Sequence, residues 1–202
     1  TGLYTFHELK KQLPSFISHG MEGAVLLFDV DRLQRINDIL GYLVGDEVLQ
    51  RLGQKCQSME GVISYRGPGG KFYCITTEKS ENALDRIYRE VQRFSEEVPR
   101  EMNLEIQLTI SCGVAFFPQD AEDFETLHAN VEYALEQAKK VGRGSIAQFS
   151  GQMHRKTVEK FRLQEVLRES VANNCRGFAL VYQPLVNGET QDVYGAETLM
   201  RF

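Results

Sequence analysis

An unbroken apolar run at residues 24–28 restricts the fold of this chain more than any other feature. A strand exposed on one face alternates polar and apolar residues, whereas a continuous run is typical of a strand covered on both faces. The run has the length of a strand, well short of the roughly 20 apolar residues of a membrane-spanning helix. The fold is therefore expected to have layers on both sides of this strand.

Helical and strand-like patterns alternate along the rest of the first 150 residues. Apolar residues recur at intervals of three and four in several segments, which predicts amphipathic helices. These segments are residues 48–56, 84–94 and 124–138, with a looser one at 158–171. Residues 106–114 instead alternate between apolar and polar side chains, which is the period of a half-buried strand.

A glycine-rich turn, Gly67-Pro68-Gly69-Gly70, separates two strand-like runs at residues 62–66 and 71–77. This arrangement predicts a β-hairpin. The elements up to Ser150 thus indicate an α+β domain with a largely antiparallel sheet. A segment of about 150 residues is long enough to bury one hydrophobic core.

The pattern changes after Ser150. A highly charged helix is expected at residues 152–171, and strand-like runs follow at residues 178–186 and 193–202. Two strands cannot bury a core by themselves. The chain is therefore expected to end inside a second domain. The predicted division is a domain at 1–150, a linker helix at 151–174 and a domain fragment at 175–202.

The charge and the cysteines disfavour some functions. The formal net charge of −5 disfavours nucleic acid as a partner, because its phosphates require a broad basic surface. A single nucleotide needs only a few cations and stays open as a ligand. The four cysteines lack the spacing of metal ligands and are expected to be buried thiols in a reducing cytosol. They are Cys56, Cys74, Cys112 and Cys175.

Two acidic residues, Asp29 and Asp31, follow the apolar run directly. Carboxylates at the exit of a buried strand are costly unless they bind a cation or cap a helix. The pair suits Mg²⁺, which takes one or two carboxylates together with substrate phosphates. Asp31 equally suits the N-cap of the next helix. From these residues alone, both interpretations stay open.

Several separated motifs resemble the GGDEF family of diguanylate cyclases. The family typically reads D-x-D-x-F-K-x-I-N-D and then L-G-H-x-x-G-D. The chain has DVDRLQRIND at residues 29–38 and LGYLVGD at residues 40–46. The resemblance also covers residues 1–3, 111–115 and 138–143. It implies a nucleotide-cyclase-like fold, a ferredoxin-like palm whose central antiparallel sheet is flanked by helices.

The resemblance also assigns roles to residues. In the family, two GTP-loaded domains face each other and each contributes half of cyclic di-GMP, which implies a homodimer. Asn37 and Asp46 match residues that hydrogen-bond the guanine edge, and Lys139 and Arg143 match cations that hold the terminal phosphates. These side chains complement guanine and phosphate chemically. The alternatives are ordinary: Asn37 at a helix end and Lys139 as a solvated cation.

The catalytic hairpin departs from the family pattern R-x-G-G-[DE]-E-F. Arg66 and Phe72 frame the turn, which places Gly70 where the metal-binding acid belongs and Lys71 where the second acid belongs. Lys71 is expected to bring a positive charge beside Asp29 and compete with Mg²⁺. The metal site is therefore weakened, and cyclase activity is not expected. The degenerate hairpin comprises Pro68, Gly69, Gly70, Lys71 and Phe72, and sliding the alignment by one residue still supplies no acid.

A second family feature is also missing. The product-inhibition site of the family is an R-x-x-D element, and the corresponding positions here hold Met59 and Val62. Neither side chain can bind the guanine or the phosphate of a dinucleotide. Feedback inhibition at this place is therefore not expected, which fits a domain that makes no product.

The last part of the chain resembles the start of an EAL-type cyclic di-GMP phosphodiesterase. FALVYQPL at residues 178–185 is similar to the opening strand, and GAETLMRF at residues 195–202 is similar to the signature strand. In that family the signature Glu binds a catalytic Mg²⁺ or Mn²⁺ inside a barrel, and a following Arg contacts substrate phosphate. Glu197 and Arg201 match these positions. A surface ion pair between them is the alternative.

The resulting hypothesis is a bacterial cyclic di-GMP signalling protein in the cytoplasm. Its inactive GGDEF domain would bind GTP and regulate an attached EAL phosphodiesterase that acts on cyclic di-GMP. A purely structural or dimerisation domain with an empty pocket is the alternative, and a weakly active cyclase ranks third. A sensory input is expected before Thr1, and membrane anchoring of the parent protein stays open.

Overall fold

The computed structural model describes residues 2–173 and 175–201, apart from the side chains of residues 153, 156–158, 160 and 161. The chain divides into two compact units, Thr1–Gly151 and Gln152–Phe202. None of the helices in the described part of the chain combines the length and the apolar character needed to span a bilayer.

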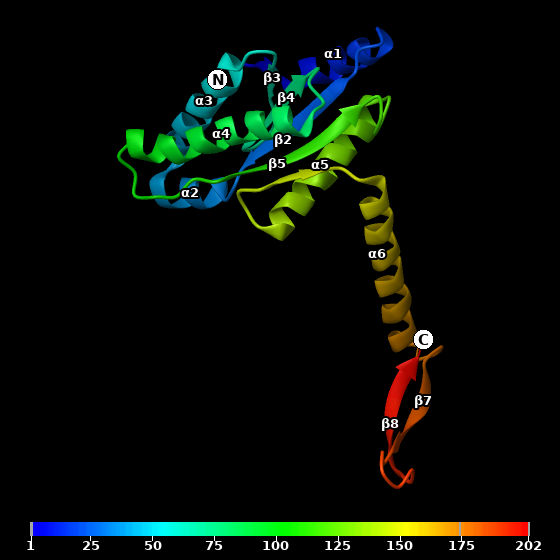
Figure 1. The fold of residues 1–202 in the computed structure, drawn as a ribbon. Coiled ribbons are helices and arrows are strands. Elements are labelled where there is room, and N and C mark those ends of the chain that lie inside the picture. Colours follow the sequence, from blue (N-terminus) through cyan, green and yellow to red (C-terminus); the bar gives the residue numbers. More distant parts are fainter. Residues whose placement is uncertain (1, 174, 202) are drawn as a thin grey trace. The chain divides into compact units, whose positions relative to one another are not determined.

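The first unit is built on a six-stranded sheet with the order β1-β3-β4-β2-β5-β6 (Figure 1). The central strand β2 pairs antiparallel with β4 and β5, whereas the edge strands β1 and β6 pair parallel with their neighbours. The predicted α+β class with a largely antiparallel sheet is confirmed. The strands are β1 (Tyr4–Thr5), β2 (Gly23–Val30), β3 (Ile63–Arg66), β4 (Lys71–Thr76), β5 (Ile110–Phe117) and β6 (Ile146–Gln148).

Helices cover both faces of this sheet. Alternate residues of β2 point to opposite faces, so Leu26 and Phe28 pack with α3 and α4 while Val25 and Leu27 pack with α1 and α5. The expectation that residues 24–28 are covered on both sides is therefore confirmed. The helices are α1 (Phe6–Ser18), α2 (Leu33–Leu40), α3 (Tyr42–Ser58), α4 (Glu81–Glu101) and α5 (Phe124–Val141).

The strand expected at residues 106–114 differs from its prediction. β5 begins at Ile110, and all of its residues are buried rather than every second one. Small residues explain the alternation, because α5 lies directly on the backbone of β5 at Gly113. A Cβ atom there would lie 2.4 Å from the backbone nitrogen of Leu135 and 2.4 Å from the carbonyl oxygen of Val131. Within β5 the period reflects close packing of a helix, whereas Gln107, which precedes the strand, is exposed to solvent.

Three of the four cysteines are buried as expected. Cys56, Cys74 and Cys112 are free thiols inside the first unit. Cys175 is free but exposed, which contradicts the prediction of four buried thiols. It lies in the turn that follows the helix of the second unit. Turns of this kind run over the surface, where no core is available to cover a side chain.

The second unit consists of one helix and one hairpin. Helix α6 (Gly151–Ala172) agrees with the predicted charged helix, although the side chains of Val158 and Phe161 lie outside the described ones. Strands β7 (Ala179–Val186) and β8 (Val193–Arg201) pair antiparallel. Apolar side chains on this hairpin are exposed on both of its faces, as two strands alone cannot form a core. That the hairpin opens an EAL barrel stays a prediction.

Candidate nucleotide site

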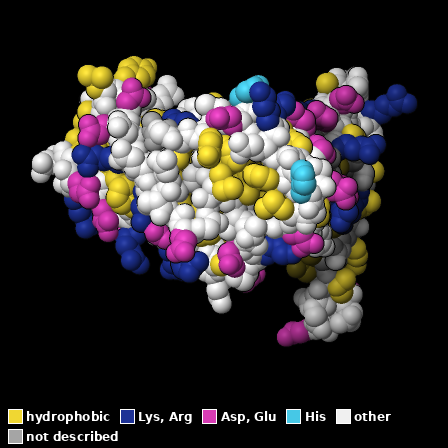
Figure 2. Space-filling model, turned by 90° about the horizontal axis from the view of Figure 1, so that it is seen from above, with side chains coloured by type: hydrophobic (Ala, Val, Ile, Leu, Met, Phe, Trp, Pro, Cys, Tyr) yellow, Lys and Arg dark blue, Asp and Glu magenta, His cyan; other side chains and the backbone are white. Residues whose placement is uncertain are grey.

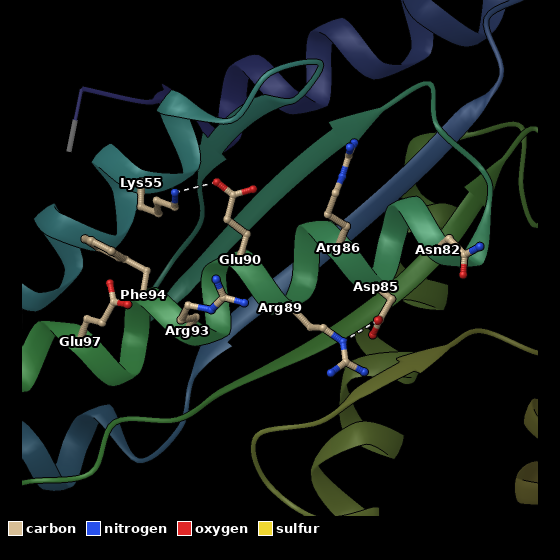
Figure 3. A pocket seen from close by; sticks show the side chains of 9 residues that line it. All are labelled: Lys55, Asn82, Asp85, Arg86, Arg89, Glu90, Arg93, Phe94 and Glu97. Atoms are coloured by element: carbon tan, nitrogen blue, oxygen red, sulfur yellow. Dashed lines mark hydrogen bonds and ion pairs between the residues drawn. The ribbon is translucent and has the colours of Figure 1, made fainter.

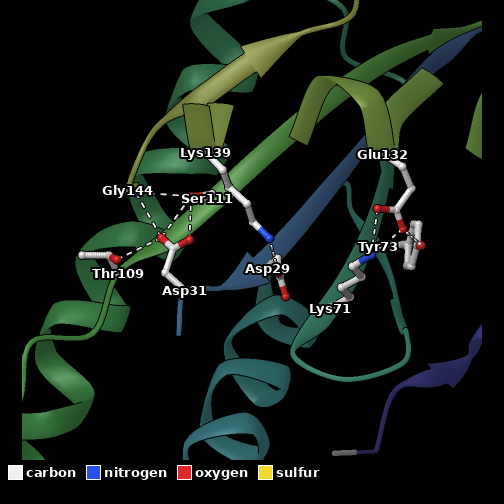
Figure 4. Close-up of polar contacts among 9 residues, drawn as sticks. All are labelled: Asp29, Asp31, Lys71, Tyr73, Thr109, Ser111, Glu132, Lys139 and Gly144. Carbon is white, nitrogen blue, oxygen red and sulfur yellow. Dashed lines mark hydrogen bonds and ion pairs between the residues drawn. The ribbon is translucent and has the colours of Figure 1, made fainter. Parts of the chain in front are cut away.

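The candidate site lies where β2 ends. Its last residues meet the β3–β4 hairpin on one side and the C-terminal part of α5 on the other (Figure 4). Asp29 is opposite Lys71 on β4 and opposite Ser111 on β5. Residues from distant parts of the sequence therefore surround the two carboxylates that follow the buried strand.

The carboxylate of Asp29 forms an ion pair with Lys139. The ammonium nitrogen Nζ of Lys139, in the last turn of α5, contacts Oδ2 of Asp29. The two side chains are 16% and 28% exposed, so they form a partly buried pair that water screens only in part. The structure thus brings together the residue assigned to a metal and a residue assigned to phosphate.

Lys71 has a different partner from the one expected. Its Nζ lies 2.7 Å from both carboxylate oxygens of Glu132 on α5. The expectation that Lys71 brings a positive charge beside Asp29 holds for the register of the two strands, but the ammonium group of Lys71 contacts Glu132, and it is Lys139 that forms the ion pair with Asp29. Tyr73 completes this contact, with its hydroxyl 3.3 Å from Glu132. Burial, and then the charge of Glu132, raises the pKa of Tyr73 well above its ordinary value.

Gly70 lies directly against Asp29. A Cβ atom at position 70 would lie 3.2 Å from Oδ1 of Asp29 and 3.1 Å from Cδ2 of Leu33. A carboxylate at this position would face Asp29, as a second metal ligand must. Gly70 has no side chain, and the hairpin offers no ligand in its place.

Arg66 has a structural role that the sequence did not reveal. Its guanidinium donates hydrogen bonds to the carbonyl oxygens of Gly67 at 2.8 Å and Lys71 at 2.6 Å, and a further one to Gly69. These bonds hold the glycine-rich turn closed. Burial lowers the pKa of Arg66, and the nearby charges of Asp46 and Asp29 act in the opposite direction. The two acids and Arg66 therefore belong to one electrostatic environment.

Asp31 does not cap the next helix, and its carboxylate forms hydrogen bonds inside the fold. It is buried, and its carboxylate accepts hydrogen bonds from the hydroxyls of Thr109 and Ser111 and from the backbone N–H of Gly144. The N-cap of α2 is Arg32, and no side chain caps that helix. Asp31 thus ties the end of β2 to β5 and to the turn after α5. Such long-range contacts cannot be read from local sequence.

Asn37 and Asp46 lie on the adjacent helices α2 and α3. The side-chain oxygen of Asn37 points at Gly45, where a Cβ atom would come within 1.9 Å of it. Only glycine at position 45 permits this approach. The oxygen is buried and has no hydrogen-bond partner within the described residues. Asp46 follows Gly45 and is exposed to solvent.

Arg143 does not take part in the Asp29–Lys139 contact. It is exposed and lines a groove of about 540 Å³ beside α2, together with Asp31, Arg32 and Thr109. Within the described part of the chain it forms no ion pair. The predicted phosphate-binding residues therefore divide: Lys139 is engaged by Asp29, and Arg143 is available to an anion.

These residues do not fit a protein-held Mg²⁺ ion. Magnesium requires oxygen ligands in octahedral geometry, usually including one or two carboxylates. Asp29 is already paired with Lys139, both oxygens of Asp31 accept hydrogen bonds, and Gly70 contributes nothing. No group of three potential metal-binding acids, histidines or cysteines exists among the described residues.

A larger hollow of about 630 Å³ lies between α3 and α4 (Figure 3). Two ion pairs lie among its lining residues: Lys55 contacts Glu90 at 2.6 Å, and Arg89 contacts Asp85 at 2.5 Å. On the face of the molecule in Figure 2, acidic and basic side chains are likewise interspersed.

Met59, at a position of the family's product-inhibition element, is buried in the core.

The residues expected to matter in the second unit lie on β8. Glu197 is opposite Gln183, and Arg201 is opposite Ala179. Residues two apart on a strand share a face, so Glu197, Leu199 and Arg201 point to the same side. Among the described residues no ion pair joins Glu197 to Arg201, and Arg201 donates instead to the carbonyl oxygen of Met200 at 3.2 Å.

Residues 3–145 match the family described as "Diguanylate cyclase, GGDEF domain", and the chain belongs to this family. Among solved structures, the GGEEF domain of a diguanylate cyclase from Vibrio cholerae gives a TM-score of 0.64 at 21% identity, over 73% of this chain and 98% of that one. An EAL/GGDEF domain protein from M. capsulatus gives 0.59 at 25% identity, over 70% and 94%. The expected nucleotide-cyclase palm fold is confirmed.

Curated relatives are larger proteins. The cyclic di-GMP phosphodiesterase NbdA of Pseudomonas aeruginosa is 28% identical over 89% of this chain and 23% of its own length. MucR of the same organism, named a bifunctional diguanylate cyclase/cyclic di-GMP phosphodiesterase, is 27% identical over 96% of this chain and 28% of its length. The chain therefore spans about a quarter of these relatives.

Proposed function

We propose that this GGDEF domain is a GTP-binding regulatory module, without diguanylate cyclase activity, in a cytoplasmic cyclic di-GMP signalling protein. The module would act through α6 on an attached EAL phosphodiesterase domain that hydrolyses cyclic di-GMP. Relatives named as cyclic di-GMP phosphodiesterases match both units of the chain at 27–28% identity. Glu197 and Arg201 on one face of β8 support the EAL assignment.

The observation that supports binding most directly is the side-chain oxygen of Asn37, which is buried and has no hydrogen-bond partner within the described residues. A buried acceptor without a donor is unfavourable, and native proteins keep few of them. Asn37 lies against Gly45 and beside the exposed Asp46, which matches the family's guanine-recognition pair. Guanine presents donors and acceptors along one edge, which an amide and a carboxylate can satisfy together.

The loss of synthesis follows from charge. Phosphoryl transfer relies on metal ions and positioned charges to neutralise the transition state. Gly70 removes one acid and Lys71 inverts the charge of the next position. Loss of this stabilisation should lower the rate by about 10³-fold or more. Binding of the purine does not depend on these two positions.

Calorimetric titration with GTP tests the proposal. We expect saturable binding, loss of binding in Asn37→Ala, and a rise in the midpoint of thermal unfolding that depends on GTP concentration. Chromatography of a GTP incubation with Mg²⁺ or Mn²⁺ should show no cyclic di-GMP. Absence of binding at millimolar GTP would overturn the regulatory role, and rapid product formation would overturn the assigned inactivity.

A structural or dimerisation domain with an empty pocket is the second candidate. The Asp29–Lys139 ion pair favours it, because the pocket neutralises its own cation without a ligand. This candidate predicts a homodimer in analytical ultracentrifugation that ignores GTP. It also predicts that GTP leaves the phosphodiesterase rate of a protein with a complete EAL domain unchanged. A weakly active cyclase, the third candidate, would be detected by the same product chromatography.

A further inference from the structure

The end of β2 holds a protein cation where the family pattern calls for a metal ion. Asp29 is the one acid of the predicted metal pair that remains, and its Oδ2 contacts the ammonium group of Lys139. The opposing position is Gly70, whose missing side chain would have reached within contact distance of Asp29. The site therefore contains one negative and one positive charge, both supplied by the chain itself.

Resting on the proposed GTP site, we infer that Lys139 replaces the metal ion and that Asp29 competes with the nucleotide for Lys139. GTP then binds without magnesium. A triphosphate that reaches Lys139 must displace the Asp29 carboxylate or share the ammonium with it. Asp29 is only 16% exposed, so solvent screens its repulsion of the phosphates poorly. In a metal-loaded site Asp29 would assist nucleotide binding by holding the metal, whereas here its negative charge opposes the binding of GTP.

The two basic residues of the β-hairpin, Lys71 and Arg66, cannot relieve this competition. Lys71 is held by both oxygens of Glu132 at 2.7 Å. The guanidinium of Arg66 is committed to the carbonyl groups of its own turn. Lys139 is therefore the cation for which Asp29 and the phosphates compete. Arg143 is exposed and forms an ion pair with neither Asp29 nor Glu132.

The inference makes a prediction opposite in sign to that of a metal site. Removing the charge in Asp29→Asn should tighten GTP binding in EDTA by about tenfold, as expected when one like charge near a phosphate is removed. A metal ligand would instead weaken binding on the same substitution. Asp29→Ser removes the same charge with a different side chain and guards against a folding defect in one variant.

Two controls identify the pathway of the effect. Glu96→Gln removes one negative charge from an exposed position of α4, on the opposite face of the sheet from α5, and should leave GTP affinity unchanged. Adding Lys139→Gln to Asp29→Asn should abolish the gain, because the gain acts through the released ammonium group. A double-mutant cycle of these variants measures the coupling directly.

Isothermal titration with GTP, in EDTA and in Mg²⁺, decides between the outcomes. Equal wild-type affinity in both buffers, with tighter binding by Asp29→Asn, supports the inference. Wild-type binding that requires Mg²⁺, or an Asp29→Asn variant that binds GTP no more tightly, overturns the inference and leaves the GTP-binding function standing. An absence of GTP binding in both the wild type and the Asp29 variants overturns the proposed function itself.

Discussion

At the scale of single residues, the candidate site depends on two glycines as much as on its polar side chains. Gly45 allows the carboxamide of Asn37 to approach α3, and Gly70 leaves Asp29 without a second acid. Asp31, which the sequence offered as a possible metal ligand, accepts hydrogen bonds from three donors. Under the proposed function, the same motif keeps Asn37 and Asp46 for guanine, while Gly70 offers no second acid beside Asp29.

Substitution of Gly45 tests how closely Asn37 is held. Alanine normally stabilises a helix relative to glycine by up to about 1 kcal/mol. At position 45 the added Cβ would displace Asn37, so we expect Gly45→Ala to destabilise the protein by about 1–2 kcal/mol and to weaken GTP binding. Urea unfolding and calorimetry measure the two effects.

The matched background is Asn37→Ala, in which the obstructing oxygen is gone. There Gly45→Ala should become stabilising, since only the ordinary helix preference remains. An equal effect of Gly45→Ala in both backgrounds would show that Asn37 does not occupy the space next to α3.

At the scale of elements, the β3–β4 hairpin is fastened to α5. Lys71 contacts Glu132, and the hydroxyl of Tyr73 lies 2.9 Å from Nε2 of His128 and 3.3 Å from Glu132. The hairpin that would handle metal and phosphate in the family pattern is therefore joined to a helix by a partly buried polar cluster. In this chain the polar cluster is a structural contact between the hairpin and α5.

A double-mutant cycle on this cluster has a defined expectation. Lys71→Gln and Glu132→Gln should each destabilise the protein and show a coupling energy of about 1 kcal/mol, because their bidentate pair is partly shielded from water. The exposed Arg89–Asp85 pair should show no measurable coupling in the same assay. Additive effects at Lys71 and Glu132 in urea unfolding would contradict the contact.

The elements themselves could largely be predicted from sequence, and their polar contacts could not. Helix period and turn residues are local signals, so the sequence predicts the hairpin and the helices that contain residues 48–56, 84–94 and 124–138. The partner of Asp29 lies 110 residues away on another element. Lys71 was the nearer candidate by register, yet the position of Glu132 on α5 decides where its ammonium group goes. Such choices depend on how elements pack.

At the scale of the whole molecule, the two units differ in what they can bury. Among the described residues, the buried apolar clusters consist of residues from the first unit, with Ile146 and Phe149 partly buried against them. The hairpin of the second unit exposes apolar side chains on both faces. The change of character after Ser150 led us to expect a second domain, and that assignment stays a prediction. The sequence could not reveal that Cys175 is exposed, because a turn buries only what neighbouring elements cover.

A fragment of residues 1–151 should therefore behave like the complete chain in unfolding and in ligand binding. We expect the free energy of unfolding of the fragment to lie within about 0.5 kcal/mol of that of the complete chain. The affinity for GTP should be the same. Circular dichroism and calorimetry on both proteins measure this. A clear loss of stability in the fragment would show that the second unit supports the first.

The seating of α5 on Gly113 has a consequence beyond packing. Lys139 follows Leu135 by one helical turn, so the height of that helix above the sheet determines how far its amino group extends. Even a methyl group at position 113 would raise the helix and draw the amino group away from Asp29. The absence of a side chain at Gly113 on β5 thus lets Lys139 reach Asp29 and keeps these two charges paired.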